Sequence, residues 1–223
     1  MRSLKIYSRR GIHNSLSPTF FPLAVRKTAI FATARITRLL NTQQPFSQKM
    51  LDFSTRLHSD DIKGCVSRIC APGGEAVLDD VFRIAVSPAE SKEANNAVWV
   101  LTHLPRHLAS YLAERRDALA DRLLSASDDT RRRLLATLLS NMTWTEDDFR
   151  GDVFDFCLEN MASRSVPLGI RARCIYLAHR MSAPVPELGR ELALALDILS
   201  AADLPPALRS AVRHVSLRRS GNG

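Results

Sequence analysis

The side chains in this sequence that could carry out chemistry are few and scattered. His103 and His107 are four residues apart, a spacing that places two metal ligands on one face of a helix. Pro105 lies between them and ends any helix there, so we expect no metal site. Three acidic pairs stand where helices are expected to begin, which favours stabilisation of the positive helix end over catalysis. These pairs are Asp60-Asp61, Asp79-Asp80 and Asp147-Asp148.

The run Arg131-Arg132-Arg133 could contact phosphate, but it follows Asp128 and Asp129, which is typical of the charged face of a helix. The sequence contains no glycine-rich phosphate loop, no GxSxG, no HExxH and no CxxC pair. We therefore expect no cofactor and no catalytic residue, and we assign no enzymatic activity.

Four cysteines are spread over the chain. Cys157 and Cys174 fall on apolar faces of expected helices, where a free thiol behaves as a small hydrophobic group. Cys65 and Cys70 are five residues apart, which fits neither a redox pair nor a usual zinc site. This usage predicts a reduced, cytoplasmic protein without disulfides.

The formal net charge of +8 is unevenly distributed along the chain. Residues 1–50 contain nine Lys or Arg and no acid, so the remaining residues contain 22 basic and 23 acidic side chains. The sequence pI of about 9.8 therefore reflects the first fifty residues. The rest of the chain is close to neutral, which argues against a strong phosphate-binding field.

Residues 1–49 are expected to form a disordered basic arm outside the core. Three alternatives remain open for this segment. It resembles an organellar transit peptide in composition, and residues 29–40 could form a basic amphipathic helix on a membrane surface. It could also be an over-called extension, with Met50 as the true start, or a basic arm with a function of its own. The sequence has no apolar run of 18 residues, so we predict no transmembrane segment.

The strongest signal in the rest of the chain is a helical phrase that occurs three times. It reads AVWVLTHL at 97–104, LATLLSNM at 135–142 and CIYLAHRM at 174–181, at shifts of 38 and 39 residues. Apolar spacing together with Pro and Gly breaks predicts helices around it. Their expected ranges are 59–70, 75–86, 90–104, 107–126, 130–142, 149–162, 167–181, 188–199 and 205–219, the first acting as a cap.

The first helix of each expected pair keeps the same register. Tyr111, Phe149 and Leu188 correspond at these shifts, as do Leu119, Cys157 and Leu196. Over about 75–219 the chain resembles HEAT/armadillo-type proteins in repeat length, helix pairing and apolar register, although the Asp and Arg typical of those repeats are not evident. The resemblance implies an all-α, right-handed α-solenoid of about four helix pairs within residues 50–220.

In such solenoids the second helices of the pairs form one face, which commonly binds partners. The register places a polar, aromatic and mildly basic row there, with residue types that are enriched at binding hot spots. The alternative is an ordinary solvated face, with Trp99 packed against a neighbouring helix. The predicted binding residues are Asn95, Asn96, Trp99, His103, Arg133, Thr137, Asn141, Arg171, Tyr176, Arg180, His214 and Arg218.

These features favour a non-catalytic scaffold or adaptor that binds a protein or peptide along this face. Two other classes stay open. HEAT-like DNA glycosylases for alkylated bases use a basic, Trp-bearing face with a catalytic Asp, which Trp99, Trp144 and Asp147 faintly resemble; nucleic acid is therefore a weaker partner prediction. A remote likeness to adenylosuccinate lyase is also conceivable, but the SSxMPxKxN loop of that group is absent.

Overall fold

The computed structural model describes residues 52–220, with side chains up to residue 217. The chain divides into two units, Met1–Met50 and Leu51–Gly223, and all described residues belong to the second. The predictions about a basic arm, a targeting peptide and a start at Met50 lie outside the described residues.

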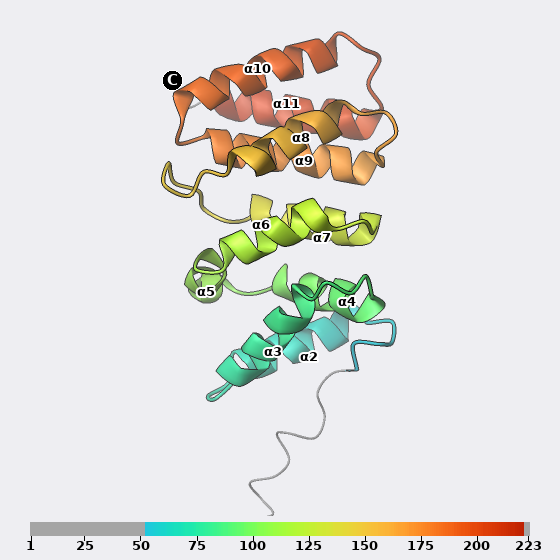
Figure 1. Cartoon of the computed structure of the whole chain (residues 1–223), viewed down its shortest axis with the longest axis vertical. Helices are drawn as coiled ribbons and strands as arrows, with labels where there is room; N and C mark the ends of the chain where they lie inside the picture. The colour runs from blue at the N-terminus through green and yellow to red at the C-terminus, as the bar shows by residue number, and fades with distance from the viewer. Residues whose placement is uncertain (1–51, 221–223) are drawn as a thin grey trace, which may run out of the picture. The chain divides into compact units, whose positions relative to one another are not determined.

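Helices connected by short loops make up the described part of the chain, and no strand occurs in it (Figure 1). Side chains cap several of them: Ser91 accepts from the amide of Ala94, and Asp128 accepts from the amide of Arg131. Proline opens the last two. The elements are α2 (Ser59–Ile69), α3 (Glu75–Ala85), α4 (Lys92–Leu101), η1 (Arg106–Leu108), α5 (Ala109–Ala113), α6 (Arg116–Ser125), α7 (Asp129–Ser140), α8 (Gly151–Ala162), α9 (Leu168–Ser182), α10 (Pro186–Ser200) and α11 (Pro206–Ser220).

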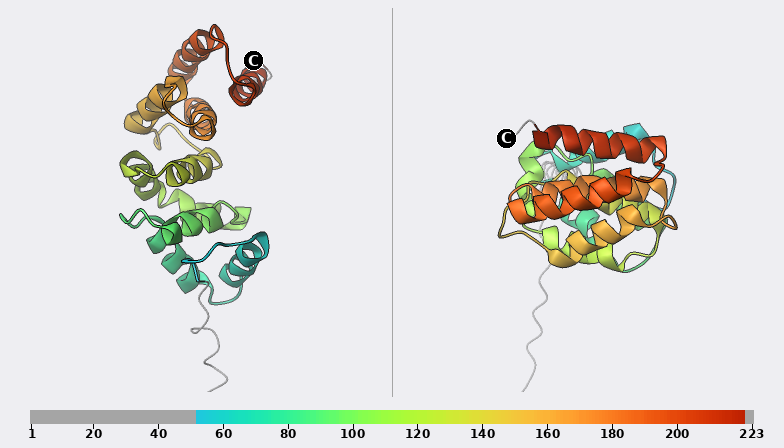
Figure 2. Two further views of the ribbon diagram at one scale, coloured as in Figure 1. Left: turned by 90° about the vertical axis from the view of Figure 1, so that its right-hand side faces the viewer. Right: turned by 90° about the horizontal axis from the view of Figure 1, so that it is seen from above.

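The helices stack as four pairs in two layers. The second helices α4, α7, α9 and α11 pack against one another in succession, and α2 packs at the start of this layer against α4. The first helices α3, α6, α8 and α10 form the other layer, and each packs against its partner. In the left view of Figure 2 the two layers stand side by side, with the second helices on the inner side of the curved stack. The predicted all-α solenoid is confirmed.

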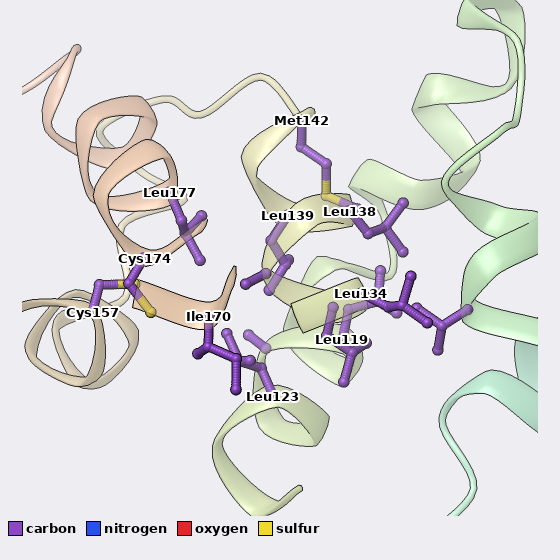
Figure 3. Packing of buried hydrophobic residues seen from close by; sticks show 14 of the residues in the cluster. Leu119, Leu123, Leu134, Leu138, Leu139, Met142, Cys157, Ile170, Cys174 and Leu177 are labelled. Carbon is purple, nitrogen blue, oxygen red and sulfur yellow. The ribbon is translucent and has the colours of Figure 1, made fainter. Parts of the chain in front are cut away.

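The core lies between the two layers and runs through the pairs without a break. Leu119, Cys157 and Leu196, which correspond in the predicted register, are all buried on first helices. Figure 3 shows Cys157 of α8 beside Cys174 of α9, next to leucines from α6 and α7. Each pair therefore buries its apolar stripe against its neighbours, and the repeat is stabilised as a stack.

The single helix predicted for 107–126 is wrong, because the chain forms η1, α5 and α6 there. The break falls at Glu114 and Arg115, between α5 and α6. The two arginines at this point have different partners. The Arg115 guanidinium lies 3.8 Å from the centre of the Tyr111 ring, whereas Arg116 is buried and donates to the Thr143 carbonyl at 2.9 Å.

In the range that the structure describes, no helix is long and apolar enough to cross a membrane.

Candidate binding face

The predicted binding residues fall into three groups by exposure. Five are exposed: His103, Arg133, Asn141, Arg180 and His214. Five are half-buried: Asn95, Asn96, Trp99, Thr137 and Tyr176. Arg171 is buried, and the side chain of Arg218 lies outside the described residues. We use the term second-helix face for the side of α4, α7, α9 and α11 that points away from the first helices.

Asn95 joins two repeats. Its Oδ1 accepts from Arg131 Nε at 2.9 Å, and its Nδ2 donates to Asp128 Oδ1 at 3.0 Å. Arg131 is fully buried and also donates to the carbonyls of Ser87 and Ala89. Burial, together with the nearby charge of Arg122, lowers the pKa of Arg131. The polar side chain of Asn95 therefore serves the packing of the first two pairs.

Asn96 and Arg171 also hold the fold together. Asn96 Nδ2 donates to the carbonyls of Phe53 and Thr55, both at 2.8 Å, and so anchors the segment before α2. Arg171 Nε donates to the Met161 carbonyl at 3.0 Å, at the end of α8. The position of Arg171, about one turn before Tyr176, predicts it on the binding surface, but the side chain is buried. A buried backbone carbonyl needs a donor, and the arginine supplies it.

The central part of the second-helix face forms a connected series of side chains across α7, α9 and α11. Arg133 lies across Gly169, where an added Cβ would come within 3.1 Å of Arg133 Cδ. One turn further along α9, the guanidinium of Arg173 lies 5.8 Å from the centre of the Tyr176 ring. Tyr176 in turn meets His214 of α11 edge-on, with ring centres 5.9 Å apart. The predicted correspondence of Tyr176 with His214 thus becomes a direct contact.

At the other end of this face, Trp99 lies half-buried beside His103. Their rings meet edge-on with centres 6.1 Å apart, and His103 Nδ1 donates to the Trp99 carbonyl at 2.9 Å. Trp99 and His103 line a cavity of about 550 Å³ together with Ile62, Lys63 and Val66 of α2. Trp99 therefore packs toward the neighbouring helix, as the alternative interpretation expected, and still borders open space.

A second cavity of about 580 Å³ opens where the loops after α4 and α7 meet. It brings together two residues of the predicted row, Asn141 and Arg180, with Arg106, Arg116 and Asp148. Arg116 is buried and pairs with Asp148, and its guanidinium lies 5.0 Å from the centre of the Trp144 ring. Sequence reasoning missed Arg116, because an arginine inside a helical pattern gives no signal that it will turn inward.

Charge is sorted between the two layers of helices. The second helices carry Lys92 in α4, three arginines in α7, three in α9 and four in α11, against only two acids, Glu93 and Asp129. Among the first helices, α3, α8 and α10 each carry three acids and α6 carries two, with four arginines in all. The near-neutral sum for the chain after residue 50 therefore conceals a basic layer and an acidic layer.

The residues that suggested a glycosylase are not arranged as an open base-binding site. Trp144 is buried, its Nε1 donates to the Leu139 carbonyl at 3.0 Å, and Arg116 covers its ring. Asp147 is exposed in the loop before α8. Among residues 52–217, no three His, Cys, Asp or Glu side chains gather as a metal ion would require.

The comparison with protein families agrees with this architecture. A family model described as a HEAT repeat domain matches residues 48–218, which includes all four helix pairs and α2. No curated protein and no solved structure matches the chain. Since the matched region covers most of the sequence, the chain belongs to the HEAT repeat family.

Proposed function

We propose that this protein is a non-catalytic repeat scaffold that binds a protein or peptide along its second-helix face. Stacked repeats of this kind present long surfaces built from many small contributions, and such surfaces are suited to binding extended partners. The proposed location is the cytoplasm.

The observation that carries this proposal is a set of arginines on the second helices, of which Arg133 and Arg180 are exposed and Arg173 is half-buried. Arg133, Arg173 and Arg180 make no ion pair with any carboxylate among residues 52–217. On the first-helix side, by contrast, Arg150 contacts Asp117, Asp121 and Asp152. Charged side chains that a fold leaves unpaired on one face are available to a partner.

Two features add shape to this face. The cavity beside Trp99 offers an apolar recess between α2 and α4, and the cavity beside Arg180 offers a polar one. Aromatic and arginine side chains near such recesses are the types that dominate binding energy in protein interfaces. A partner that crosses the repeats could engage both recesses and the arginines between them.

Affinity capture from the native host's lysate tests this proposal. The full chain is compared with a variant that carries His103→Ala, Arg180→Ala and His214→Ala, three exposed positions on the second-helix face. A matched control replaces Arg83, Glu159 and Arg190 by alanine; all three are exposed on first helices. Retention of one stoichiometric protein by the wild type and the control, but not by the face variant, is expected.

Nuclease treatment separates the two partner classes. A protein that stays bound after nuclease supports a protein scaffold, whereas loss of all bound material after nuclease would point to nucleic acid. Equal retention by all three folded proteins would contradict the proposal, because the second-helix face would then have no part in binding.

A further inference from the structure

We infer that the partner of the second-helix face is an acidic peptide segment, bound in an extended conformation across α7, α9 and α11. This inference rests on the proposed function and names the chemistry of its partner. Its contacts are the guanidinium groups of Arg133 and Arg173 on the central part of this face and that of Arg180 at the edge of the face.

The first step in the argument is the contrast between paired and unpaired arginines. On the first helices, Arg83 pairs with Asp80 at 2.8 Å and Arg190 pairs with Glu187 at 2.7 Å. The second helices α9 and α11 contain no acidic residue, and Arg209 at the start of α11 pairs with Asp203 of the preceding loop. The positive charge of this face therefore has no internal counterpart along α9, and carboxylates of a partner would supply it.

The second step concerns geometry. Packed helices lie about 8–10 Å apart, and an extended chain advances about 3.3–3.6 Å per residue. A peptide that crosses the layer of second helices therefore needs about three residues to pass from one repeat to the next. Arg133 reaches over Gly169 onto α9, and Arg173 lies one turn beyond that glycine, so both can meet carboxylates on one such peptide.

The third step is the polar cavity at the edge of the face. Arg180 borders this cavity together with Arg106, and neither makes an ion pair among the described residues. The single carboxylate that lines the cavity, Asp148, is already engaged by Arg116 and by the hydroxyl and amide of Thr145. The cavity thus holds two guanidinium groups without a carboxylate partner beside the path of the bound peptide, and an acidic side chain of the peptide can enter it.

A peptide fits this face better than a nucleic acid does. Proteins that bind single strands stack bases on open aromatic rings. Here the Tyr176 ring has Arg173 over it and His214 at its edge, and Trp99 is turned toward α2. The acidic first helices also keep the net charge after residue 50 close to zero, whereas nucleic-acid affinity depends on neutralising many phosphates.

The test is a selection of random displayed peptides on the full-length chain, followed by fluorescence polarisation with the enriched peptides. We expect the enriched peptides to be rich in Asp and Glu at intervals of two to three residues. Replacing their acids by Asn and Gln is expected to weaken binding at least about tenfold. Raising the salt concentration should weaken it as well, because exposed charges are screened.

Two double variants with the same change in charge locate the site. Arg173→Glu/Arg180→Glu reverses two cations of the face and should weaken binding at least about tenfold. Arg83→Glu/Arg190→Glu does the same on the first helices and should leave the affinity within about twofold. Circular dichroism melts verify that both variants fold, and Arg173→Lys/Arg180→Lys should retain most of the affinity.

Several results would overturn the inference. They are enrichment of neutral or basic peptides, absence of any enrichment, equal effects of the two double variants, or tighter binding of single-stranded oligothymidine than of the selected peptides. If the lysate capture still yields a partner that depends on the second-helix face, the proposed scaffold function stands, and only the preference of this face for acidic peptides is wrong.

Discussion

The Arg131 guanidinium donates from Nε to Asn95 Oδ1 at 2.9 Å and so joins the first turn of α7 to the first turn of α4. Both residues belong to polar stretches that sequence patterning assigns to the surface. Their contact instead buries an arginine between two repeats, with Ser87 and Ala89 supplying carbonyl acceptors. A stack of repeats needs such contacts, because each loop between helices leaves backbone groups that must be paired.

Asn95→Ala is expected to destabilise the fold. The substitution removes the acceptor for Arg131 Nε in a buried setting, which costs about 1–3 kcal/mol of unfolding free energy. Denaturant unfolding followed by circular dichroism measures this change. Asn141 is exposed directly after α7, so Asn141→Ala should change the free energy of unfolding by no more than about 0.5 kcal/mol. If Asn95→Ala unfolded like Asn141→Ala, the structural role of Asn95 would be wrong.

The fold could be read from the sequence because two independent patterns agreed. Apolar residues recur at helical spacing, and Pro206 opens a helix as expected. The sequence predicts Pro186 in a break before a helix at 188–199, but it opens α10. The break between α5 and α6 could not be read in the same way, since Glu114 and Arg115 are neither glycine nor proline and the apolar spacing continues on both sides. Directly after the break, Arg116 donates to the carbonyl of Thr143, a contact with a residue distant in sequence that the local pattern does not show.

The candidate site could be predicted only in part. Register alone brought Tyr176 and His214 together, because it fixes which residues of successive second helices are neighbours. The prediction for Arg171 is wrong, because a helical position one turn before Tyr176 does not tell an exposed arginine from one that donates to a buried carbonyl. A net charge counted along the chain also did not show the basic and acidic layers, because acidic first helices and basic second helices alternate in sequence and their charges cancel.

Two glycines should respond in opposite ways to alanine. A Cβ on Gly74 would lie 2.3 Å from the Ile69 carbonyl oxygen, which is backbone and cannot move aside, so Gly74→Ala should cost about 1–3 kcal/mol. A Cβ on Gly169 would meet only Cγ and Cδ of the exposed Arg133 side chain, which can shift by a few tenths of an ångström, and alanine is the better helix former by up to about 1 kcal/mol. Gly169→Ala should therefore raise the melting temperature, and Gly74→Ala should lower it. Two changes of the same sign would contradict these assignments.

The four thiols should differ sharply in reactivity. Cys70 is exposed, whereas Cys157 and Cys174 are buried beside each other. Burial, and the hydrogen bond with Cys174, raise the pKa of the Cys157 thiol well above its ordinary value. A thiol reagent at pH 8 should label Cys70 in the native protein and reach the other three only on unfolding. Rapid labelling of Cys157 in the folded chain would contradict the packing of α8 on α9.

Alkaline pH should weaken the fold through the same groups. Burial raises the pKa of Cys65 and Cys157, and it raises that of Tyr111, whose hydroxyl donates to Asp79 at 2.7 Å. The folded state therefore holds these protons more tightly than the unfolded chain does. The stabilisation is fully present below about pH 8.5 and declines as the pH rises above the ordinary thiol pKa. Unfolding free energies measured from pH 7 to 10.5 should fall, and a rise would contradict the burial of these groups.

The pair Arg116–Asp148 should contribute stability at neutral pH. Asp148 accepts from the Thr145 hydroxyl at 2.6 Å and from its amide at 3.0 Å, and it pairs with the buried Arg116. Asp148→Asn leaves that guanidinium without its carboxylate, so a loss of about 1–3 kcal/mol is expected. The adjacent Asp147→Asn is the matched control, since Asp147 is exposed and should change stability by no more than about 0.5 kcal/mol.

The effect of Asp148→Asn should vanish in acid. The hydrogen bonds from Thr145, with the charge of Arg116, hold the pKa of Asp148 below its usual range. A carboxyl with a lowered folded pKa contributes stability above its ordinary pKa of about 3.9 and loses it as the pH falls through the folded value. Unfolding of the wild type and of Asp148→Asn at pH values from 6 down to 2.5 should therefore show a gap that narrows below about pH 4. A gap that stayed constant would mean that the charge of Asp148 has no part in holding Arg116, and that only the shape of the side chain matters there.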